Sequence, residues 1–167
     1  MRTVIGVMGS GAVLDRHAEE DAYLLGRLIA EQGWALLNGG RACGVMDATA
    51  RGAHDAGGLV VGVLPDDDAS FATPHLDIAI VTGMRDARNY INALSSQVVV
   101  ALPGKAGTLS EVAFALNAGR TVVAVGWDVG PALGDYAAAG KLLRVETPEE
   151  AVMAVSAALA KDAGWRH

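Results

Sequence analysis

Short runs of apolar residues alternate with longer segments of helical periodicity along almost the whole chain. In the runs, apolar residues stand at successive positions rather than at every second one, which is typical of strands buried on both faces of a parallel sheet. These runs predict strands at Thr3–Met8, Trp34–Leu37, Leu59–Leu64, Ile78–Val81, Val98–Leu102, Thr121–Val125 and Leu142–Val145.

The longer segments carry the spacing and the stop signals of helices. Leu24, Leu25, Leu28 and Ile29 recur at helical spacing, and Gly33 follows them as a stop. The predicted helices are Asp15–Gln32, Val45–Ala56, Asp86–Ser96, Leu109–Ala118 and Pro148–Lys161. Strands that alternate with helices in this way predict an α/β fold, a Rossmann-like doubly wound parallel sheet with helices on both faces. We expect a single domain over residues 1–167.

Composition and charge narrow the classes of function. Hydrophobic residues make up 51% of the 167 residues and charged residues 19%, which suits a sizeable core and excludes a disordered chain. Thirteen basic and nineteen acidic residues give a net charge of −6, which argues against a nucleic-acid partner but allows a small phosphorylated ligand. No apolar run reaches the roughly 18–20 residues of a membrane span, and no signal-peptide pattern is visible. We therefore expect a cytoplasmic protein without a membrane partner.

Residues that bind metals are few and scattered. Cys43 is the single cysteine, which excludes an intramolecular disulfide and a CxxC site. We interpret it as a small, partly buried filler, because no histidine neighbours it in sequence. His17, His54, His75 and His167 form no close pair and no HExxH motif, so we expect no metal site.

Loops that follow strands carry the candidate chemistry, because ligands of doubly wound sheets bind at the carboxyl ends of strands beside the reversal of strand order. Gly9, Ser10 and Gly11 follow the first strand, where exposed N–H groups suit a phosphate or carboxylate. A tight turn is the alternative, and the full GxGxxG spacing is absent. Gly39, Gly40 and Arg41 follow the second strand, where Arg41 is either a bidentate phosphate ligand or a solvated arginine.

The loop after strand 98–102 opens a helix and carries the strongest phosphate signal. Gly104, Lys105, Ala106, Gly107 and Thr108 combine turn N–H groups, a helix N-terminus and a hydroxyl, although the Walker pattern is absent. The Lys105 side chain either adds charge to the phosphate contact or points to water. One turn further, the Glu111 carboxylate either faces a bound sugar or is an ordinary first-turn acid.

A fourth polar element stands at the start of the predicted helix 86–96. Asn92 lies four positions after Arg88 and three after Asn89, which places these side chains on one face of that helix. We expect Arg88 and Asn92 to reach the ligand, a solvated helix start being the alternative. The acidic loop Asp66-Asp67-Asp68 is open to interpretation as a lid, a partner contact, a metal site or a solvated turn, and we favour the solvated turn.

These segments resemble one known superfamily. GGRACGVMDATARGAHDAGG resembles the GGG-x-x-GLMG…GA…GG stretch of the LOG-like (SLOG) proteins, PGKAGTLSE resembles their PGGxGTxxE motif, and Arg88 stands where they have the arginine of M-H-E-R-K. The resemblance covers roughly Val4 to Val125. Within the superfamily, ARNYINALSSQVVVA and NGGRACGVMDA look like segments of the molybdenum cofactor carrier proteins.

The resemblance implies two alternative functions, each of which would use the same phosphate-binding loop. LOG-type enzymes are phosphoribohydrolases that release a nucleobase from a nucleoside 5′-monophosphate, which would make Glu111 and Arg88 catalytic. A carboxylate suits that reaction, because departure of the base builds positive charge on the sugar. Lys105, Asp86, Asn89 and Arg41 depart from the hydrolase motifs and fit better a carrier of a phosphorylated pterin.

Three hypotheses follow. The first is a binding protein for the molybdenum cofactor, the second a nucleoside 5′-monophosphate phosphoribohydrolase, and the third a nucleotide-sensing module without turnover. Members of the superfamily are also called lysine decarboxylases, which we reject because Lys105 in a glycine turn does not indicate a pyridoxal Schiff base.

The resemblance further implies a homodimer or homotetramer. The apolar helix 109–118 is consistent with an interface or with complete burial in one subunit.

Overall fold

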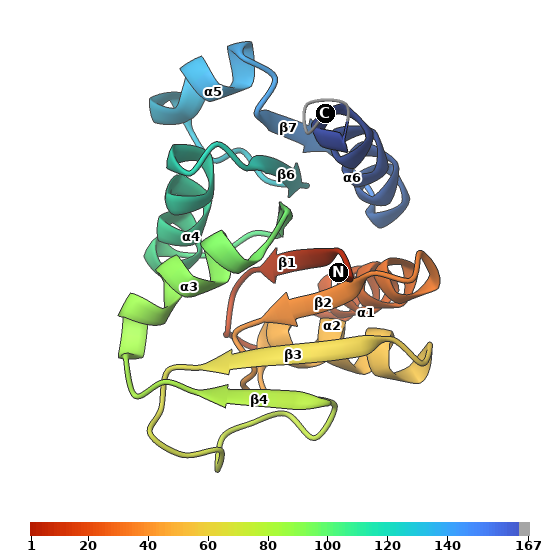
Figure 1. Cartoon of the computed structure of the whole chain (residues 1–167), viewed down its shortest axis with the longest axis vertical. Coiled ribbons are helices and arrows are strands. Elements are labelled where there is room, and N and C mark those ends of the chain that lie inside the picture. The colour runs from red at the N-terminus through yellow and green to blue at the C-terminus, as the bar shows by residue number, and fades with distance from the viewer. Residues whose placement is uncertain (164–167) are drawn as a thin grey trace.

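Seven parallel strands form one sheet in the computed structural model, which describes residues 1–163 (Figure 1). Their order across the sheet is β4-β3-β2-β1-β5-β6-β7. The strands are β1 (Val4–Met8), β2 (Ala35–Asn38), β3 (Leu59–Leu64), β4 (Ile78–Val81), β5 (Val98–Ala101), β6 (Thr121–Val125) and β7 (Leu142–Val145). Each neighbouring pair is parallel, so the predicted doubly wound sheet is confirmed.

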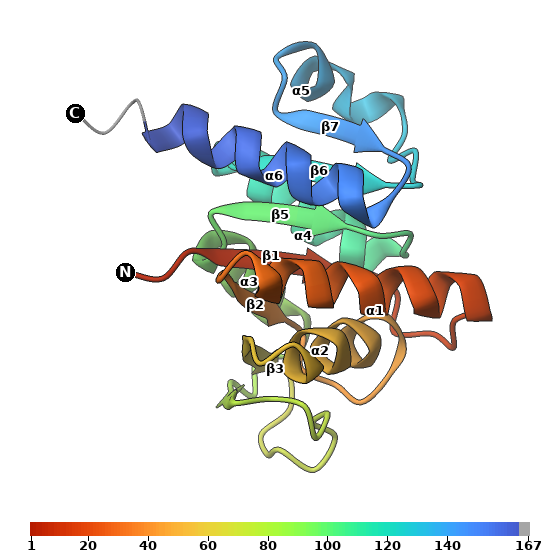
Figure 2. The same cartoon turned by 90° about the vertical axis from the view of Figure 1, so that its right-hand side faces the viewer.

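Helices cover both faces of this sheet (Figures 1 and 2). The helices are α1 (Arg16–Glu31), α2 (Gly44–Asp55), α3 (Arg88–Ser95), α4 (Ala106–Asn117), α5 (Gly134–Ala138) and α6 (Pro148–Ala163). Buried side chains of α1, α2 and α6 belong to one hydrophobic cluster, and those of α3 and α4 belong to a second cluster across the sheet.

The central strands supply side chains to both clusters. In β5, Val98 and Val100 pack under α1, α2 and α6, whereas Val99 and Ala101 pack under α3 and α4. All four side chains are fully buried. Because both faces are covered, every position of such a strand must be apolar, which explains the runs in the sequence.

Strand β4 departs from that expectation. Its residues are apolar, and the sequence pattern predicted burial on both faces. In the structure all four residues are exposed, with Ile78 at 46% and Ile80 at 43% of their full accessible surface. The reason is position, because β4 is the edge strand beyond β3.

Three helical segments differ from the predicted ones. The helix predicted from Asp86 begins with a separate 3₁₀ turn, η1 (Arg85–Ala87), and continues as α3, which has no side-chain cap. Helix α4 begins at Ala106, three residues before the predicted start, so the glycine-rich segment forms its first turn. The stretch 128–140, which lies outside the predicted strands and helices, contains the 3₁₀ turn η2 (Pro131–Leu133) and α5.

The strand order reverses between β1 and β5. From β1 the chain moves outward through β2, β3 and β4, then crosses back to β5 on the other side of β1. The loops after β1 and β5 are joined by a hydrogen bond of 3.2 Å from the Ser10 N–H to the Pro103 carbonyl. This is the place where doubly wound sheets bind their ligands.

Candidate functional site

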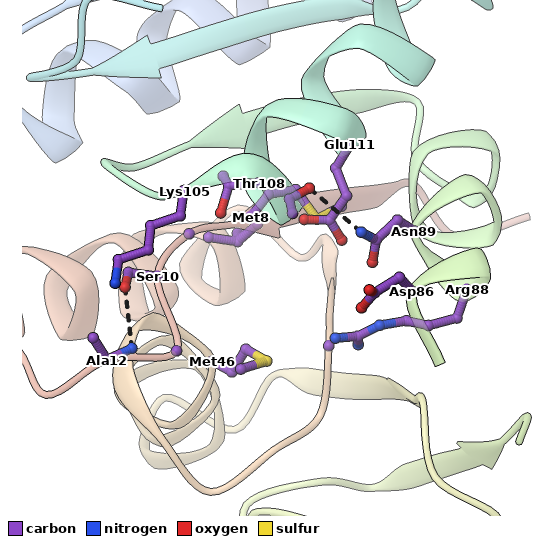
Figure 3. Close-up of a pocket in the computed structure, with 15 residues that line it drawn as sticks. Met8, Ser10, Ala12, Met46, Asp86, Arg88, Asn89, Lys105, Thr108 and Glu111 are labelled. Carbon is purple, nitrogen blue, oxygen red and sulfur yellow. Dashed lines mark hydrogen bonds between the residues drawn. The ribbon is translucent and has the colours of Figure 1, made fainter. Parts of the chain in front are cut away.

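A cavity of about 250 Å³ opens at the carboxyl ends of β1 and β5, at the reversal of strand order (Figure 3). It is bounded by the loops after β1, β2 and β5 and by the starts of α3 and α4. Its lining residues are Val7, Met8, Gly9, Ser10, Gly11, Ala12, Gly39, Met46, Asp86, Arg88, Asn89, Lys105, Gly107, Thr108 and Glu111.

The first turn of α4 forms one wall of the cavity. Lys105 is the extended N-cap residue, and its side chain provides no capping hydrogen bond. The first amide groups of a helix have no partner within the helix, and they carry the positive end of its dipole. Thr108 packs over Gly104, where a Cβ atom would collide with the threonine hydroxyl. Glycine at 104 therefore keeps the hydroxyl beside these amide groups, an arrangement suited to an anion.

Glu111 is a buried carboxyl group in the same wall, with 7% of its surface exposed. Its Oε1 accepts a hydrogen bond of 2.8 Å from the Asn92 amide, whose residue is fully buried. Burial raises the pKa of Glu111 to about 7, although the Asn92 hydrogen bond and the Arg88 charge act in the opposite direction. The carboxyl group therefore changes its charge near neutral pH.

Arg88 crosses the cavity from the first turn of α3. Its Nη1 donates a hydrogen bond of 2.6 Å to the Val63 carbonyl, which fixes the guanidinium at the end of β3. A Cβ atom at Gly39 would collide with this guanidinium and with the Met46 sulfur. The glycine after β2 is thus required for Arg88 to lie in its observed place. The buried Nε of Arg88 has no hydrogen-bond partner within residues 1–163.

A buried asparagine holds the loop after β2. Asn38 donates from Nδ2 to the Met46 carbonyl at 2.8 Å and to Thr49 Oγ1 at 3.1 Å, and its Oδ1 accepts from the Gly40 N–H at 2.8 Å. These bonds join the end of β2 to the first turns of α2. Asn38 was not among the predicted site residues, although an asparagine that ends an apolar run is a recognisable signal.

The structure brings most of the predicted site residues together. The loop residues Gly9, Ser10, Gly11, Gly39, Lys105, Gly107 and Thr108 all line the cavity with Arg88 and Glu111. Gly40, Gly104, Ala106, Asn92 and Arg41 do not line it. Asn92 lies behind Glu111 as its hydrogen-bond donor, and Gly104 lies beneath Thr108.

Arg41 is turned away from this cavity. Its guanidinium makes two hydrogen bonds to the Asp66 carboxylate, from Nε at 3.0 Å and from Nη2 at 2.5 Å. It also lies over the Phe71 ring, 5.7 Å from the ring centre. This ion pair lowers the pKa of Asp66 and ties the acidic loop to the loop after β2. Asp66 is therefore not part of the freely solvated turn that we favoured, because a cation from a distant loop folds against it.

Six residues that line the cavity were absent from the predicted site, namely Val7, Met8, Ala12, Met46, Asp86 and Asn89. Asn89 lines the cavity where Asn92 was expected. Its Nδ2 donates a hydrogen bond of 3.0 Å to Ser110 Oγ near the start of α4. Asp86 and Met46 also line the cavity. Asn89 and Asp86 belong to the polar segment at the start of the predicted helix 86–96. The sequence therefore pointed to the segment but not to the side chains of it that face the cavity. Met46 gave no signal, because an apolar residue in a helix is ordinarily a core residue.

Three further features are seen within residues 1–163. No three side chains of the kinds that ligate metals gather there. No helix of this region has the length and apolar character needed to cross a membrane. Cys43 is half-buried at the start of α2.

Comparison with known proteins places the chain in a family. A family model described as the SLOG cluster4 family matches residues 2–152. The chain belongs to the SLOG cluster4 family. The predicted membership of the LOG-like superfamily is thus confirmed.

Two solved structures resemble this SLOG cluster4 protein over nearly its whole length. The molybdenum cofactor binding protein of the phototrophic bacterium Rippkaea orientalis is 40% identical, with a TM-score of 0.88 over 94% of this chain and 97% of that one. The molybdenum cofactor carrier protein of Chlamydomonas reinhardtii is 40% identical, with a TM-score of 0.86 over 96% of this chain and 99% of that one.

A curated enzyme resembles a part of the chain. The cytokinin riboside 5′-monophosphate phosphoribohydrolase of Mycobacterium tuberculosis is 38% identical over 100 residues, which are 58% of this chain and 54% of that protein. This SLOG cluster4 protein therefore has carriers among its structural relatives and a hydrolase among its sequence relatives.

Proposed function

We propose that the cavity binds a phosphorylated small molecule, with its phosphate at the first turn of α4. The observation that carries this proposal is the convergence of unpaired amide groups, the Thr108 hydroxyl and the Lys105 side chain on one wall of one cavity. Each is a hydrogen-bond donor or a positive charge, and a phosphate offers acceptors to all of them. Ser10, on the loop after β1, adds its hydroxyl to the same cavity (Figure 3).

We propose further that the phosphorylated molecule is the molybdenum cofactor, and that the protein carries or stores it. The support is the likeness over 94% or more of this chain to two proteins that are described as binding or carrying that cofactor. The cofactor is cargo in this proposal, and its terminal phosphate occupies the α4 site.

Hydrolysis of a nucleoside 5′-monophosphate is the second candidate, and Glu111 is the observation that favours it. A carboxyl group with a pKa of about 7 is ionised in about half of the molecules at neutral pH. In the reaction the bond between C1′ and the base nitrogen breaks and the base leaves with the electron pair. Water adds its oxygen to C1′ as a hydroxyl group, and the proton that water releases ends on the departing base. The Glu111 carboxylate would stabilise the positive charge on the sugar, and Arg88 would orient the substrate.

One ligand experiment separates these two functions. The purified protein and its Glu111→Gln variant are each mixed with AMP or with molybdenum cofactor, and thermal stability is recorded. The AMP samples are then chromatographed for free adenine. Stabilisation by the cofactor with AMP left intact supports the carrier. Free adenine that disappears in the variant establishes the hydrolase, and no stabilisation by either ligand contradicts a phosphate site.

We also propose that the protein forms a homodimer or a homotetramer through α3 and α4. Val112, on the inner side of α4, is fully buried, whereas Leu109 on the same helix is 39% exposed. Tyr90 and Leu94 of α3 are exposed at 51% and 37%. Apolar side chains in neighbouring positions on two packed helices suit burial against a second copy. Light scattering of the wild type and of a Leu94→Glu variant tests this, since a monomeric wild type would contradict it.

A further inference from the structure

A carboxylate and a guanidinium end at the same wall of the cavity. Asp86, in the 3₁₀ turn η1, and Arg88, in the first turn of α3, both line it. Figure 3 shows the ends of both side chains directed into the cavity, on the side away from Ser10 and Lys105. The two residues thus face the part of a ligand that lies far from the proposed phosphate position.

Asp86 is an exposed residue whose two carboxylate oxygens are available at the mouth of the cavity. Within residues 1–163 it makes no ion pair within 4.0 Å, although Arg88 lies two positions away in the chain. None of the side-chain hydrogen bonds of that region involves its carboxylate either. A carboxylate that lines a cavity without a protein partner is an acceptor pair for a ligand.

Arg88 presents donors beside those acceptors. Its Nη1 is used by the Val63 carbonyl, which anchors the group, while its other nitrogens make no hydrogen bond within residues 1–163. The pair therefore offers guanidinium donors and two carboxylate acceptors to the same part of a ligand. A heterocycle whose edge carries an acceptor beside two donors is complementary to it.

We propose that Asp86 and Arg88 read the 2-amino-4-oxo edge of a pterin or guanine ring. That edge carries a carbonyl oxygen, a ring N–H and an exocyclic amino group in a row. Arg88 donates to the carbonyl, and the two oxygens of Asp86 accept from the N–H and the amino group. At the corresponding positions adenine has an amino group, which donates, and a ring nitrogen, which accepts. The amino group would meet the donors of Arg88 and the ring nitrogen the acceptors of Asp86, so the pair disfavours adenine.

The cavity between the two ends suits a flat ring. Gly9 and Gly39 bring backbone close to the ligand, and the Met46 side chain lies at the cavity floor (Figure 3). The thioether of a methionine packs well against aromatic rings. A planar heterocycle thus packs on Met46 while its edge meets Asp86 and Arg88.

This inference rests on the proposed phosphate site, and four nucleotides test it. GMP, IMP, AMP and XMP share the phosphate and the ribose but differ at the edge of the base. We expect affinity to fall in the order GMP, IMP, AMP, with GMP on the order of tenfold or more tighter than AMP, because a site built for hydrogen bonds rejects a ligand that lacks them.

A substitution at Asp86 reverses one of these preferences. Asp86→Asn replaces one acceptor by an N–H donor, which suits the 2-oxo group of XMP and opposes the amino group of GMP. We expect the ratio of GMP to XMP affinity to fall by about tenfold or more in this variant. Asp135→Asn, on the distant helix α5, is the matched control and leaves the ratio unchanged.

The outcomes separate this inference from the proposed function. Equal affinity for all four nucleotides, or an Asp86→Asn effect of the same size on each, overturns the edge recognition and leaves the phosphate site standing. Failure of all four nucleotides to bind overturns the edge recognition, and it overturns the phosphate site as well when molybdenum cofactor also fails to stabilise the protein. A ratio that changes in Asp86→Asn and not in the control supports the assignment, even where that variant is less stable, because a ratio is independent of the folded fraction.

Discussion

Replacing Glu111 by glutamine isolates the effect of one buried carboxyl group on folding. The variant keeps the size and shape of the side chain, and its amide oxygen can still accept the hydrogen bond that Asn92 donates at 2.8 Å. Only the ability to ionise is lost. The comparison with the wild type therefore measures by how much the buried negative charge lowers the free energy of unfolding.

The magnitude follows from the change in pKa on folding. Burial raises the pKa of Glu111 from 4.5 to about 7. Below about pH 4.5 both the folded and the unfolded states are protonated, and the free energy of unfolding is unaffected. Between about pH 4.5 and 7 the unfolded state ionises first, so the free energy of unfolding of the wild type falls by about 3 kcal/mol and then levels off.

Urea unfolding at pH 5, 6, 7 and 8 provides the measurement. Relative to the wild type, Glu111→Gln should be more stable by about 1 kcal/mol at pH 5 and by about 3 kcal/mol at pH 8. Glu149→Gln, at an exposed position in the first turn of α6, controls for removal of a carboxylate. Parallel stability curves for wild type and Glu111→Gln would refute the reasoning, as would a variant that loses stability at high pH.

Three other substitutions test the surroundings of Glu111 and the cavity wall at the first turn of α4, where the phosphate is proposed to bind. Thr108→Val removes the hydroxyl from that wall and should weaken binding of a phosphorylated ligand by about 1–2 kcal/mol, measured by calorimetry; unchanged affinity would place the phosphate elsewhere. Gly104→Ala puts a methyl group against Thr108 and should lower the free energy of unfolding by about 1–3 kcal/mol in urea, whereas a wild-type value would show that Thr108 moves freely. Asn92→Ala removes the hydrogen bond that favours ionised Glu111, so the pKa of Glu111 rises further above 4.5. The pH at which the stability curve levels off should then move upward from the wild-type value, and an unmoved curve would contradict this role for Asn92.

Motifs predicted the cavity better than they predicted the direction of single side chains. The glycine-rich loops and Arg88 were found from their positions after strands, and these segments meet in the cavity. Arg41 had the same kind of signal but pairs with Asp66, a partner 25 positions away. Asn89 and Asn92 lie on similar faces of α3, yet Asn89 lines the cavity and Asn92 lies behind Glu111. Spacing along a helix gives a face, whereas packing of α3 on α4 decides which residue of that face meets the ligand.

The sequence by itself determined the alternation of strands and helices, because burial on one or both faces leaves a period in the chain that needs no knowledge of distant partners. It also determined the glycine-rich loop before α4, since glycine positions and a helix start are local features. Only the tertiary structure decided that β4 is an exposed edge, that Glu111 is buried enough to raise its pKa to about 7, and that Asp86 and Arg88 share a wall. These properties depend on which segments lie side by side, and strand order and helix packing bring together residues that the chain itself keeps apart.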